Sequence, residues 1–227
     1  MTDQTARLLA VSNALADSVT PGELDATLRA ITTTAITVLP QVDFSSVSIN
    51  HPGGQLETKG ATDDLICDLD ATQYDLHEGP CYHAATDAAY VVSPNLAADE
   101  RFPRYGPEAV RKGIRSQVGL RLYTGDRAQG ALNLYSKNVG AFEDLADLGA
   151  LFATQAAMAI GYATEVNNLR AALETRSVIG KAVGIVMERY QLSDDRAFAF
   201  LTRLSQHRNV KLRTVAEEFV TAHDAPA

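Results

Sequence analysis

The chain has 227 residues, of which 46% are hydrophobic and 21% are charged, and its formal net charge at pH 7 is -8. This composition excludes a disordered chain, and no apolar run reaches the length of a membrane span. With only two cysteines, Cys67 and Cys81, the sequence also excludes a scaffold held together by several disulfides.

The length predicts two structural units. A chain of 227 residues suits one packed domain of roughly 150 residues together with a smaller appendage. Residues 1–17 contain no basic cluster followed by an apolar core, so we expect no signal peptide and a cytoplasmic protein without a membrane partner. In that reducing compartment both cysteines are expected to be free thiols.

The first part of the chain predicts an α+β domain. Residues 1–39 show helical spacing in two stretches, with a break at Thr20, Pro21 and Gly22. A hairpin is expected around residues 52–54, and residues 101–113 read as a loop that enters a helix. The expected strands are 44–50, 54–62, 89–94, 116–123 and 130–136. We therefore expect a mixed β-sheet of about five or six strands flanked by helices.

One long helix is predicted over residues 143–187. Its seam positions step by three and four residues: Leu145, Leu148, Phe152, Gln155, Ala159, Tyr162, Val166, Leu169, Leu173 and Arg176. Eight of these ten positions are apolar, which is typical of a coiled-coil-like stripe. The stripe predicts a homodimer, and its first half is also expected to pack on the sheet.

The last quarter of the chain is helical and basic. Residues 176–213 carry eight Lys or Arg against three acids, a balance of 8 - 3 = +5 inside a chain of net charge -8. Ser193 is expected to cap a second helix that Asn209 ends, with Ala197, Phe198, Leu201 and Leu204 facing inward, and a third helix begins at Leu212. A positive module on a negative protein points to a nucleic-acid partner.

Three motifs in this tail carry a family resemblance. The order R..I..A.GI.M, then S..RAF..L..LS, then N.KL..VA, over about residues 165–222, resembles the ANTAR family of RNA-binding modules in bacterial transcription antitermination. The resemblance implies an ANTAR domain over 166–222 and a homodimer that presents two modules to tandem RNA stem-loops of mRNA leaders. The residues expected to contact RNA are Arg176, Lys181, Ala182, Gly184, Arg203, Ser205, Gln206, His207, Asn209, Lys211 and Arg213.

These residues divide by chemistry. Lys and Arg supply salt-sensitive phosphate contacts, which suits Lys181, Arg203, Lys211 and Arg213. Loop bases are read by small polar groups, and four of these lie close together at the exit of the second helix: Ser205, Gln206, His207 and Asn209. Ala182 and Gly184 have no side chain that reads a base, so they are expected to permit close approach, either of the RNA backbone or of a neighbouring helix.

The first domain also carries a resemblance. The segments HEGPCYHA, VVSPNLAADERFPRYGPEAVRKGIRSQVGLRL and GALNLYS resemble the GAF family over about residues 20–165. This implies a sensor domain, assigned to residues 1–165, with a pocket between the sheet and the segments that cover it. A small-molecule ligand of open identity is implied, and no metal is expected. The residues expected to line the pocket are Tyr74, Gly79, Pro80, Cys81, Arg101, Ser116, Asn133 and Tyr135.

Two different functions remain open for the tail. Residues 204–220 also read as helix, turn and helix, as in DNA-binding regulators, although the turn lacks glycine and AEEF stands where base-reading side chains are needed. The chain could otherwise be a sensor that acts by protein-protein contact. The local positive charge argues against such a sensor.

The sequence argues against four kinds of chemistry in the first domain: metal binding, a redox reaction, cyclic-nucleotide binding and catalysis. His77, Cys81 and His83 are spaced unlike the paired motifs of zinc sites, and a redox role for Cys81 requires an exposed thiol with a lowered pKa. A partial match to cyclic-nucleotide GAF domains lacks the family's asparagine; its residues are Ser136, Lys137, Phe142, Glu143 and Asp144. No Walker loop and no G-x-S-x-G motif occurs, so the sequence does not predict an enzyme.

Overall fold

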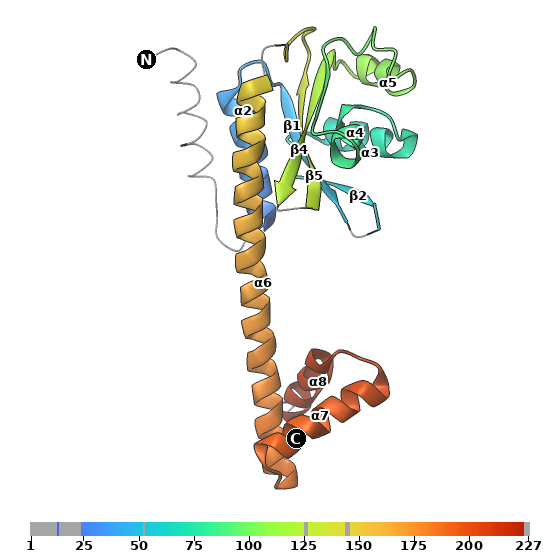
Figure 1. Cartoon of the computed structure of the whole chain (residues 1–227). Coiled ribbons are helices and arrows are strands. Elements are labelled where there is room, and N and C mark those ends of the chain that lie inside the picture. The colour runs from blue at the N-terminus through green and yellow to red at the C-terminus, as the bar shows by residue number, and fades with distance from the viewer. Residues whose placement is uncertain (1–12, 14–23, 52, 125–126, 144–145, 225–227) are drawn as a thin grey trace. The chain divides into compact units, whose positions relative to one another are not determined.

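The computed structural model in Figure 1 describes residues 13, 24–51, 53–124, 127–143 and 146–224. The chain divides into two compact units, Met1–Glu165 and Val166–Ala227. Several expectations lie outside the described residues and side chains: the break at Thr20, Pro21 and Gly22, the positions Asp144 and Leu145, and the side chains of Leu148 and Gln155.

A five-stranded sheet forms the centre of the first unit. Its strands are β1 (Phe44–Asn50), β2 (Leu56–Lys59), β3 (Tyr90–Ser93), β4 (Ser116–Thr124) and β5 (Arg127–Ser136), in the order β2-β1-β5-β4-β3. All five predicted strands are confirmed. The four pairings are antiparallel, which corrects the expected mixed sheet. For two of them the chain leaves no alternative: β2 follows β1 and β5 follows β4 after only a few residues, whereas a parallel pair needs a crossover of about a dozen or more.

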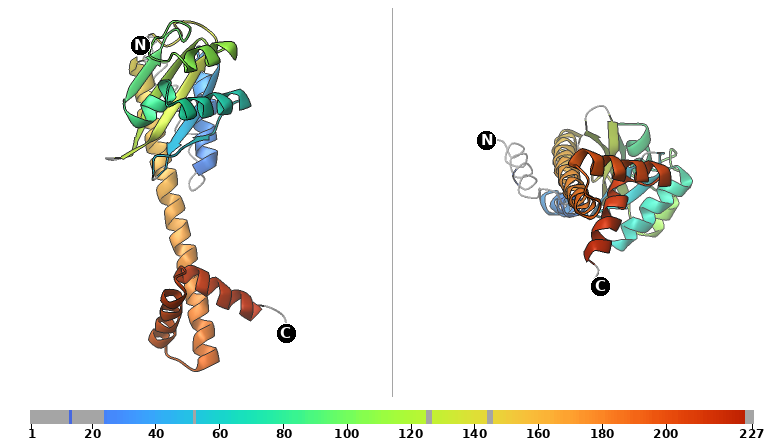
Figure 2. Two further views of the ribbon diagram at one scale, coloured as in Figure 1. Left: turned by 90° about the vertical axis from the view of Figure 1, so that its right-hand side faces the viewer. Right: turned by 90° about the horizontal axis from the view of Figure 1, so that it is seen from below.

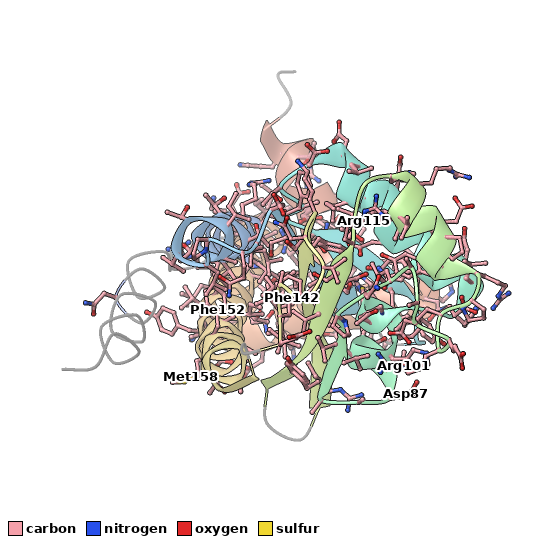
Figure 3. The ribbon with its side chains drawn as sticks, turned by 90° about the horizontal axis from the view of Figure 1, so that it is seen from above. Asp87, Arg101, Arg115, Phe142, Phe152 and Met158 are labelled. Atoms are coloured by element: carbon pink, nitrogen blue, oxygen red, sulfur yellow. The ribbon has the colours of Figure 1, made fainter. Side chains whose placement is uncertain are left out.

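Helices cover both faces of this sheet, which confirms an α+β fold (Figures 1 and 2). One face carries α2 (Leu24–Val38) and the first part of α6 (Ala146–Tyr190), and the other carries α3 (Asp64–Leu76), α4 (Pro80–Thr86) and α5 (Tyr105–Arg111). Figure 3 shows Phe142 and Phe152, both fully buried, on the face that α6 covers, and Arg101 on the opposite side.

Helices α3 and α4 occupy a stretch that reads in the sequence only as a polar connection. Asp63 caps α3 by accepting a hydrogen bond from the backbone of Leu65 at 2.9 Å. The buried face of α3 includes two polar residues, Asp70 and Gln73, and this mixture hides the apolar period of a helix.

The second unit is a three-helix module. The C-terminal part of α6 packs against α7 (Asp194–Arg208) and α8 (Leu212–Asp224), as the left view of Figure 2 shows. Its buried core consists of Ala182, Val183, Val186, Ala197, Leu201, Val215 and Ala216. The expectation that Phe198 faces inward is wrong: it is 45% exposed, because its neighbours Ala197 and Leu201 take the core-facing positions of α7.

Helix α6 runs without a break through both units and ends three residues later than predicted, at Tyr190. Gln191 then takes a left-handed conformation, with φ 53°. Along the predicted seam, Phe152 and Ala159 are buried in the first unit, whereas Tyr162, Leu169 and Leu173 are 54%, 56% and 67% exposed. Among the helices described, none is both long and apolar enough to cross a membrane.

Candidate nucleic-acid interface and candidate ligand site

The cations of the second unit fall into two groups. Arg208 and Arg213 are paired with acids of α8, with Arg208 Nη2 donating to Glu218 at 2.8 Å and Arg213 Nε donating to Glu217 at 2.7 Å. Seven others have no ion pair with another described residue and are exposed: Arg170, Arg176, Lys181, Arg189, Arg196, Arg203 and Lys211. The positive charge available to a partner therefore resides mainly in this second group.

The two small residues expected to permit close approach have different surroundings. Ala182 is fully buried in the core of the module, so it presents no surface to RNA, and only its packing role stands. Gly184 is exposed, and a Cβ built there would meet no atom within 4 Å. Close helix packing within this chain therefore does not account for Gly184.

The turn between α7 and α8 holds the residues expected to address bases. Asn209 takes a left-handed conformation with φ 50°, and its backbone N–H donates to Gln206 O at 3.2 Å, so it ends α7 as predicted. The Ser205 hydroxyl donates to Val210 O at 2.6 Å, which commits that hydroxyl to the turn. Gln206, His207 and Lys211 are exposed around the same turn.

The structure does not bring all the expected RNA residues to one place. Arg176 lines a groove with Ala171, Ala172, Thr175, Ile179 and Phe198. Lys181 and Gly184 line a second groove with Ile185, Glu188, Val220 and His223. Because successive residues of a helix are about 100° apart, these two sets lie on opposite sides of α6.

Three further residues of the module are candidate contacts that the sequence did not single out: Tyr190, Arg196 and Phe200. The rings of Tyr190 and Phe200 lie 5.6 Å apart between centroids and are 50% and 38% exposed. The sequence could have revealed two of them, because Arg196, Phe200 and Arg203 are spaced by four and three residues on α7 and therefore lie on one face of the helix.

The first unit contains a buried polar cluster between the sheet and helices α3 and α4. We call it the Asp70 cluster; its members are Ser46, Ser48, Thr58, Asp70, Gln73, Tyr74, Cys81, Asn133 and Tyr135. Residues from β1, β2, β5, α3 and α4 meet here. Such a concentration of polar groups in an interior is costly unless they are hydrogen-bonded.

Asp70 accepts hydrogen bonds from four side chains. Its carboxylate receives the Ser46 hydroxyl at 2.7 Å, the Thr58 hydroxyl at 3.1 Å and the Gln73 amide at 3.3 Å, and the Tyr135 hydroxyl also donates to it. Complete burial raises the pKa of Asp70 to about 6, although these hydrogen bonds oppose the increase. Burial therefore favours the neutral acid, and the four donors favour the carboxylate.

Cys81 is fully buried in the same cluster. Its Sγ lies 2.8 Å from the Ser48 hydroxyl, and its backbone N–H donates to Gln73 Oε1 at 3.0 Å. Burial raises the pKa of the Cys81 thiol well above its ordinary value. A redox role that needs an exposed thiol with a lowered pKa is therefore wrong for Cys81.

Six of the eight expected ligand residues lie in or beside this cluster. Tyr74, Cys81, Asn133 and Tyr135 are members, and Gly79 and Pro80 begin α4 next to it. Gly79 is required there, because a Cβ would stand 2.3 Å from Gln73 Oε1 and the backbone has φ 114°. The members that the sequence did not predict are Ser46, Ser48, Thr58, Asp70 and Gln73.

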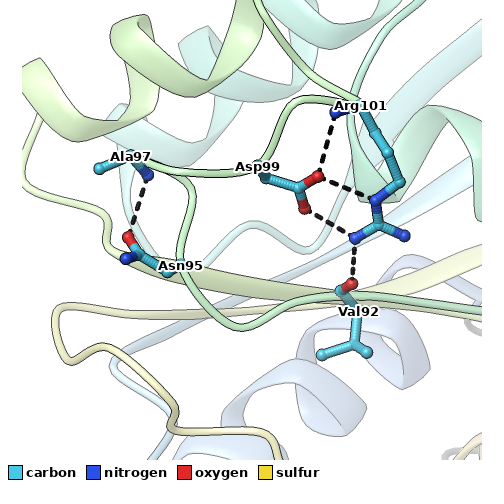
Figure 4. A network of polar contacts seen from close by, with 5 residues as sticks. All are labelled: Val92, Asn95, Ala97, Asp99 and Arg101. Carbon is cyan, nitrogen blue, oxygen red and sulfur yellow. Dashed lines mark hydrogen bonds and ion pairs between the residues drawn. The ribbon is translucent and has the colours of Figure 1, made fainter.

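Arg101 and Ser116, the other two expected ligand residues, lie outside the Asp70 cluster and make other contacts. Arg101 pairs with Asp99 at 2.7 Å and donates to Val92 O, as Figure 4 shows. The Ser116 hydroxyl donates to Asn138 O at 2.8 Å. Both side chains stabilise connections at the end of the sheet.

The residues considered for cyclic-nucleotide binding and for metal binding have other contacts in the first unit. The residues of the partial cyclic-nucleotide match make structural contacts: Ser136 donates to Asp43 at 3.1 Å, and Phe142 is fully buried. Within the described part of the chain, no three His, Cys, Asp or Glu residues are grouped to hold a metal ion. His83 instead lies 3.0 Å from Asp87, one helical turn away.

Comparisons with known proteins agree with this architecture. Residues 22–161 match the family model described as GAF domain, and residues 167–220 match that of the ANTAR domain. The comparison with curated proteins gave no match.

Solved structures similar to this chain share the fold of its first unit. The GAF domain of phosphoenolpyruvate-protein phosphotransferase from Acinetobacter is 19% identical, with 74% of this chain and 99% of that chain covered and a TM-score of 0.53. A putative GAF sensor protein from Burkholderia vietnamiensis is 13% identical, with the same coverage and TM-score. The free methionine-R-sulfoxide reductase from Neisseria meningitidis, solved with its substrate, is 14% identical. The match covers 75% of this chain and 95% of that chain, with a TM-score of 0.50.

The two family matches lie in the two compact units, and the first spans more than half of the chain. The chain therefore belongs to the GAF domain family and carries an ANTAR domain after its GAF domain.

Proposed function

We propose that this protein is a signal-responsive regulator whose ANTAR module binds RNA stem-loops and acts in transcription antitermination. The observation that carries the proposal is the ANTAR match over residues 167–220, on a module with seven exposed cations that lack an ion pair among the described residues. Cations of this kind release counterions from phosphates when they bind RNA. The regulatory character of both domains supports a role without catalysis.

The contacts of α8 disfavour DNA binding by a helix-turn-helix. Glu217 and Glu218 lie on α8, the helix that would enter the major groove. Both are exposed and are paired with Arg213 and Arg208. The acids would approach phosphates of the same sign, and releasing the two arginines would cost their ion pairs.

The sensor part of the proposal rests on the Asp70 cluster. Asn133 is fully buried, and its Oδ1 has no hydrogen-bond partner among the described residues. A buried acceptor without a donor is unfavourable, so a ligand or water that donates to Asn133 would bind with a gain in free energy. We propose that a small polar ligand is sensed at this cluster.

The exposed stripe on α6 supports a homodimer. Tyr162, Leu169 and Leu173 are more than half exposed, and they follow the seam spacing of a coiled coil. A second copy would bury these side chains. The dimer would then present two modules, as tandem stem-loops require.

The continuity of α6 suggests how a signal reaches the module. Phe152 and Ala156 belong to the core of the first unit, Ala182 and Val186 belong to that of the second, and one helix carries all four. We propose that ligand binding alters the packing of α6 in the dimer and so changes RNA affinity. A Gly-Ser linker inserted after Val166 is expected to abolish the ligand response while leaving RNA binding intact.

The test of RNA binding is a salt series. The protein is titrated with a tandem stem-loop RNA and with a DNA duplex of equal length, beside the triple variant Lys181→Ala, Arg203→Ala, Lys211→Ala. We expect tight RNA binding that weakens steeply with salt. In the variant, the slope of log K against log salt concentration should be smaller by about two, because three phosphate contacts are lost. Arg29→Ala with Arg115→Ala, which removes two exposed cations of the first unit, is the control. Equal binding of the DNA duplex, or no binding of either, would refute the proposal.

A further inference from the structure

One face of α7 carries cations and an aromatic ring without an acid among them. Arg196, Phe200, Arg203 and His207 follow one another at spacings of four, three and four residues, so they form a single strip along the helix. All four are exposed. We call this strip the α7 face.

The ring of Phe200 is held in place from two sides. Tyr190, at the end of α6, lies 5.6 Å away between ring centroids at a tilt of 41°. Phe219 of α8 meets Phe200 edge-on at 6.2 Å and is itself partly buried against the core of the module. Phe200 and Tyr190 are 38% and 50% exposed, so core packing does not explain why two large rings lie at this surface.

The charges on the α7 face are available to a partner. Arg196 and Arg203 have no ion pair with another described residue, whereas Arg208, on a different side of α7, is neutralised by Glu218. The acids Asp194 and Asp195 begin the same helix, but they lie roughly 100° or more from Arg196 around its axis. The surface thus combines exposed rings with flanking positive charge.

This combination suits the unpaired bases of RNA. Every base has a flat face that stacks on an aromatic ring, and the adjacent phosphates attract arginine. In a DNA duplex the bases are stacked on one another and unavailable, so the rings would contribute little there. A protein partner would also bury the rings, but it would have to supply acids to both arginines.

We propose that Tyr190 and Phe200 form a stacking platform for bases of an RNA loop, with Arg196 and Arg203 contacting the flanking phosphates. This inference rests on the proposed RNA-binding function. It assigns the reading of bases to rings on α7 and α6, in addition to the polar residues around the turn after α7.

The test compares variants that remove rings with one that removes a ring elsewhere. Tyr190→Ala and Phe200→Leu are assayed with a stem-loop RNA and with a blunt RNA duplex that has the same stem sequence and no loop, over a salt series. Phe198→Ala is the matched control, because Phe198 is 45% exposed on the same helix but lies about 200° around its axis from Phe200. Circular dichroism verifies that each variant keeps its helices.

Each platform variant is expected to lose roughly fivefold or more in affinity for the loop RNA, because a base then loses the aromatic ring on which it stacks. Its salt slope should stay unchanged. Arg196→Ala and Arg203→Ala should instead reduce that slope by about 0.7 each. Phe198→Ala should change neither quantity, and Phe200→Tyr, which keeps a ring, should retain the affinity.

The outcomes separate this inference from the function on which it rests. If the wild type binds the loop RNA and the Tyr190→Ala and Phe200→Leu variants bind it equally well, the platform is wrong and RNA binding stands. If these variants lose dimer mass and keep RNA affinity, the platform is equally wrong and the face is an interface between copies. If the wild type binds no RNA at any salt, both proposals fail.

Discussion

Asp70 shows how burial changes the chemistry of one residue. Asp64 and Asp68 lie on the same helix, α3, and are exposed, whereas Asp70 is fully buried beneath the sheet. Transfer into this interior disfavours the charged carboxylate, and four hydrogen-bond donors partly offset that cost. The residue is consequently a source of pH dependence in the first unit.

The contribution of Asp70 to the stability of the first unit is expected to fall as pH rises through the titration of its carboxyl group. Its pKa is about 6 in the fold against an ordinary value of 3.8, so between these values the folded state holds more protons than the unfolded state. The Asp70 contribution to the free energy of unfolding should therefore decrease by ~3 kcal/mol from about pH 4 to above pH 6, whereas the carboxyl groups with lowered pKa values, such as Glu78 and Asp99, act in the opposite direction. Urea unfolding across this range measures it.

The control for this prediction is Asp70→Asn, which has no titrating group at that position. All other carboxyl groups are common to the two proteins, so the difference between their pH profiles isolates Asp70. Parallel profiles over the whole range would contradict the assignment.

A larger side chain is expected to have opposite effects on stability at Ala182 and at Gly184. Ala182→Leu should destabilise the second unit by ~1–3 kcal/mol, because the core around Ala182 is closed. Gly184→Ala should stabilise α6 by ~0.5–1 kcal/mol, because the added methyl group meets open space and alanine favours the helix. Amide hydrogen exchange of residues 182–220 measures both. Loss of protection in Gly184→Ala would show that something packs against Gly184.

At the scale of elements, the turn from α7 to α8 depends on one backbone conformation. Asn209 has φ 50°, a region that asparagine and glycine enter readily and β-branched residues do not. Asn209→Gly should keep the stability of the module, whereas Asn209→Val should lower it by ~1–2 kcal/mol. Thermal unfolding followed by circular dichroism distinguishes the two.

The glycine variant also separates the two roles of Asn209. Because Asn209→Gly preserves the turn, any loss of RNA affinity in this variant reports the contribution of the amide side chain to base contact. Equal stability of the valine and glycine variants would mean that the left-handed conformation is not required.

Elements differ in how well their sequences reveal them. Strands β4 and β5 and helices α7 and α8 follow the periods of 2 and 3.6 residues, and α6 is marked by the apolar seam that steps by three and four residues, so the sequence predicts all of them. The sequence does not predict helices α3 and α4. Helix α4 has only seven residues, and in α3 the buried face includes the polar residues Asp70 and Gln73, which interrupt the apolar period. Their polarity makes sense only with the cluster on the strands that they cover.

For the whole molecule, the exposed stripe of α6 predicts the effect of charge on assembly. Leu169→Asp with Leu173→Asp should convert the proposed dimer to monomer, because two carboxylates would be buried against a second copy. Asn167→Asp with Asn168→Asp adds the same charge at neighbouring exposed positions outside the stripe. Sedimentation equilibrium measures the mass of each. A monomeric wild type, or a dimer that tolerates both double variants, would refute the interface.

The sequence by itself determined those features that depend on near neighbours in the chain. Hydrophobic periods identify the helices and strands, Asn209 marks the end of α7, and the excess of Lys and Arg marks the tail, since backbone geometry and local charge act over a few residues. The family motifs likewise lie in contiguous segments, and both were confirmed.

Only the tertiary structure decided which polar groups meet. Asp70 bonds to Tyr135 across 65 positions of the chain, and Arg208 pairs with Glu218, a residue beyond the segment whose charge was counted. The tertiary structure also decided that Ala182 is buried inside the module and that Phe200 lies at its surface, although both are apolar residues of helices. Burial and pairing depend on which distant segments pack together, and that packing is the result of the fold rather than of any local pattern.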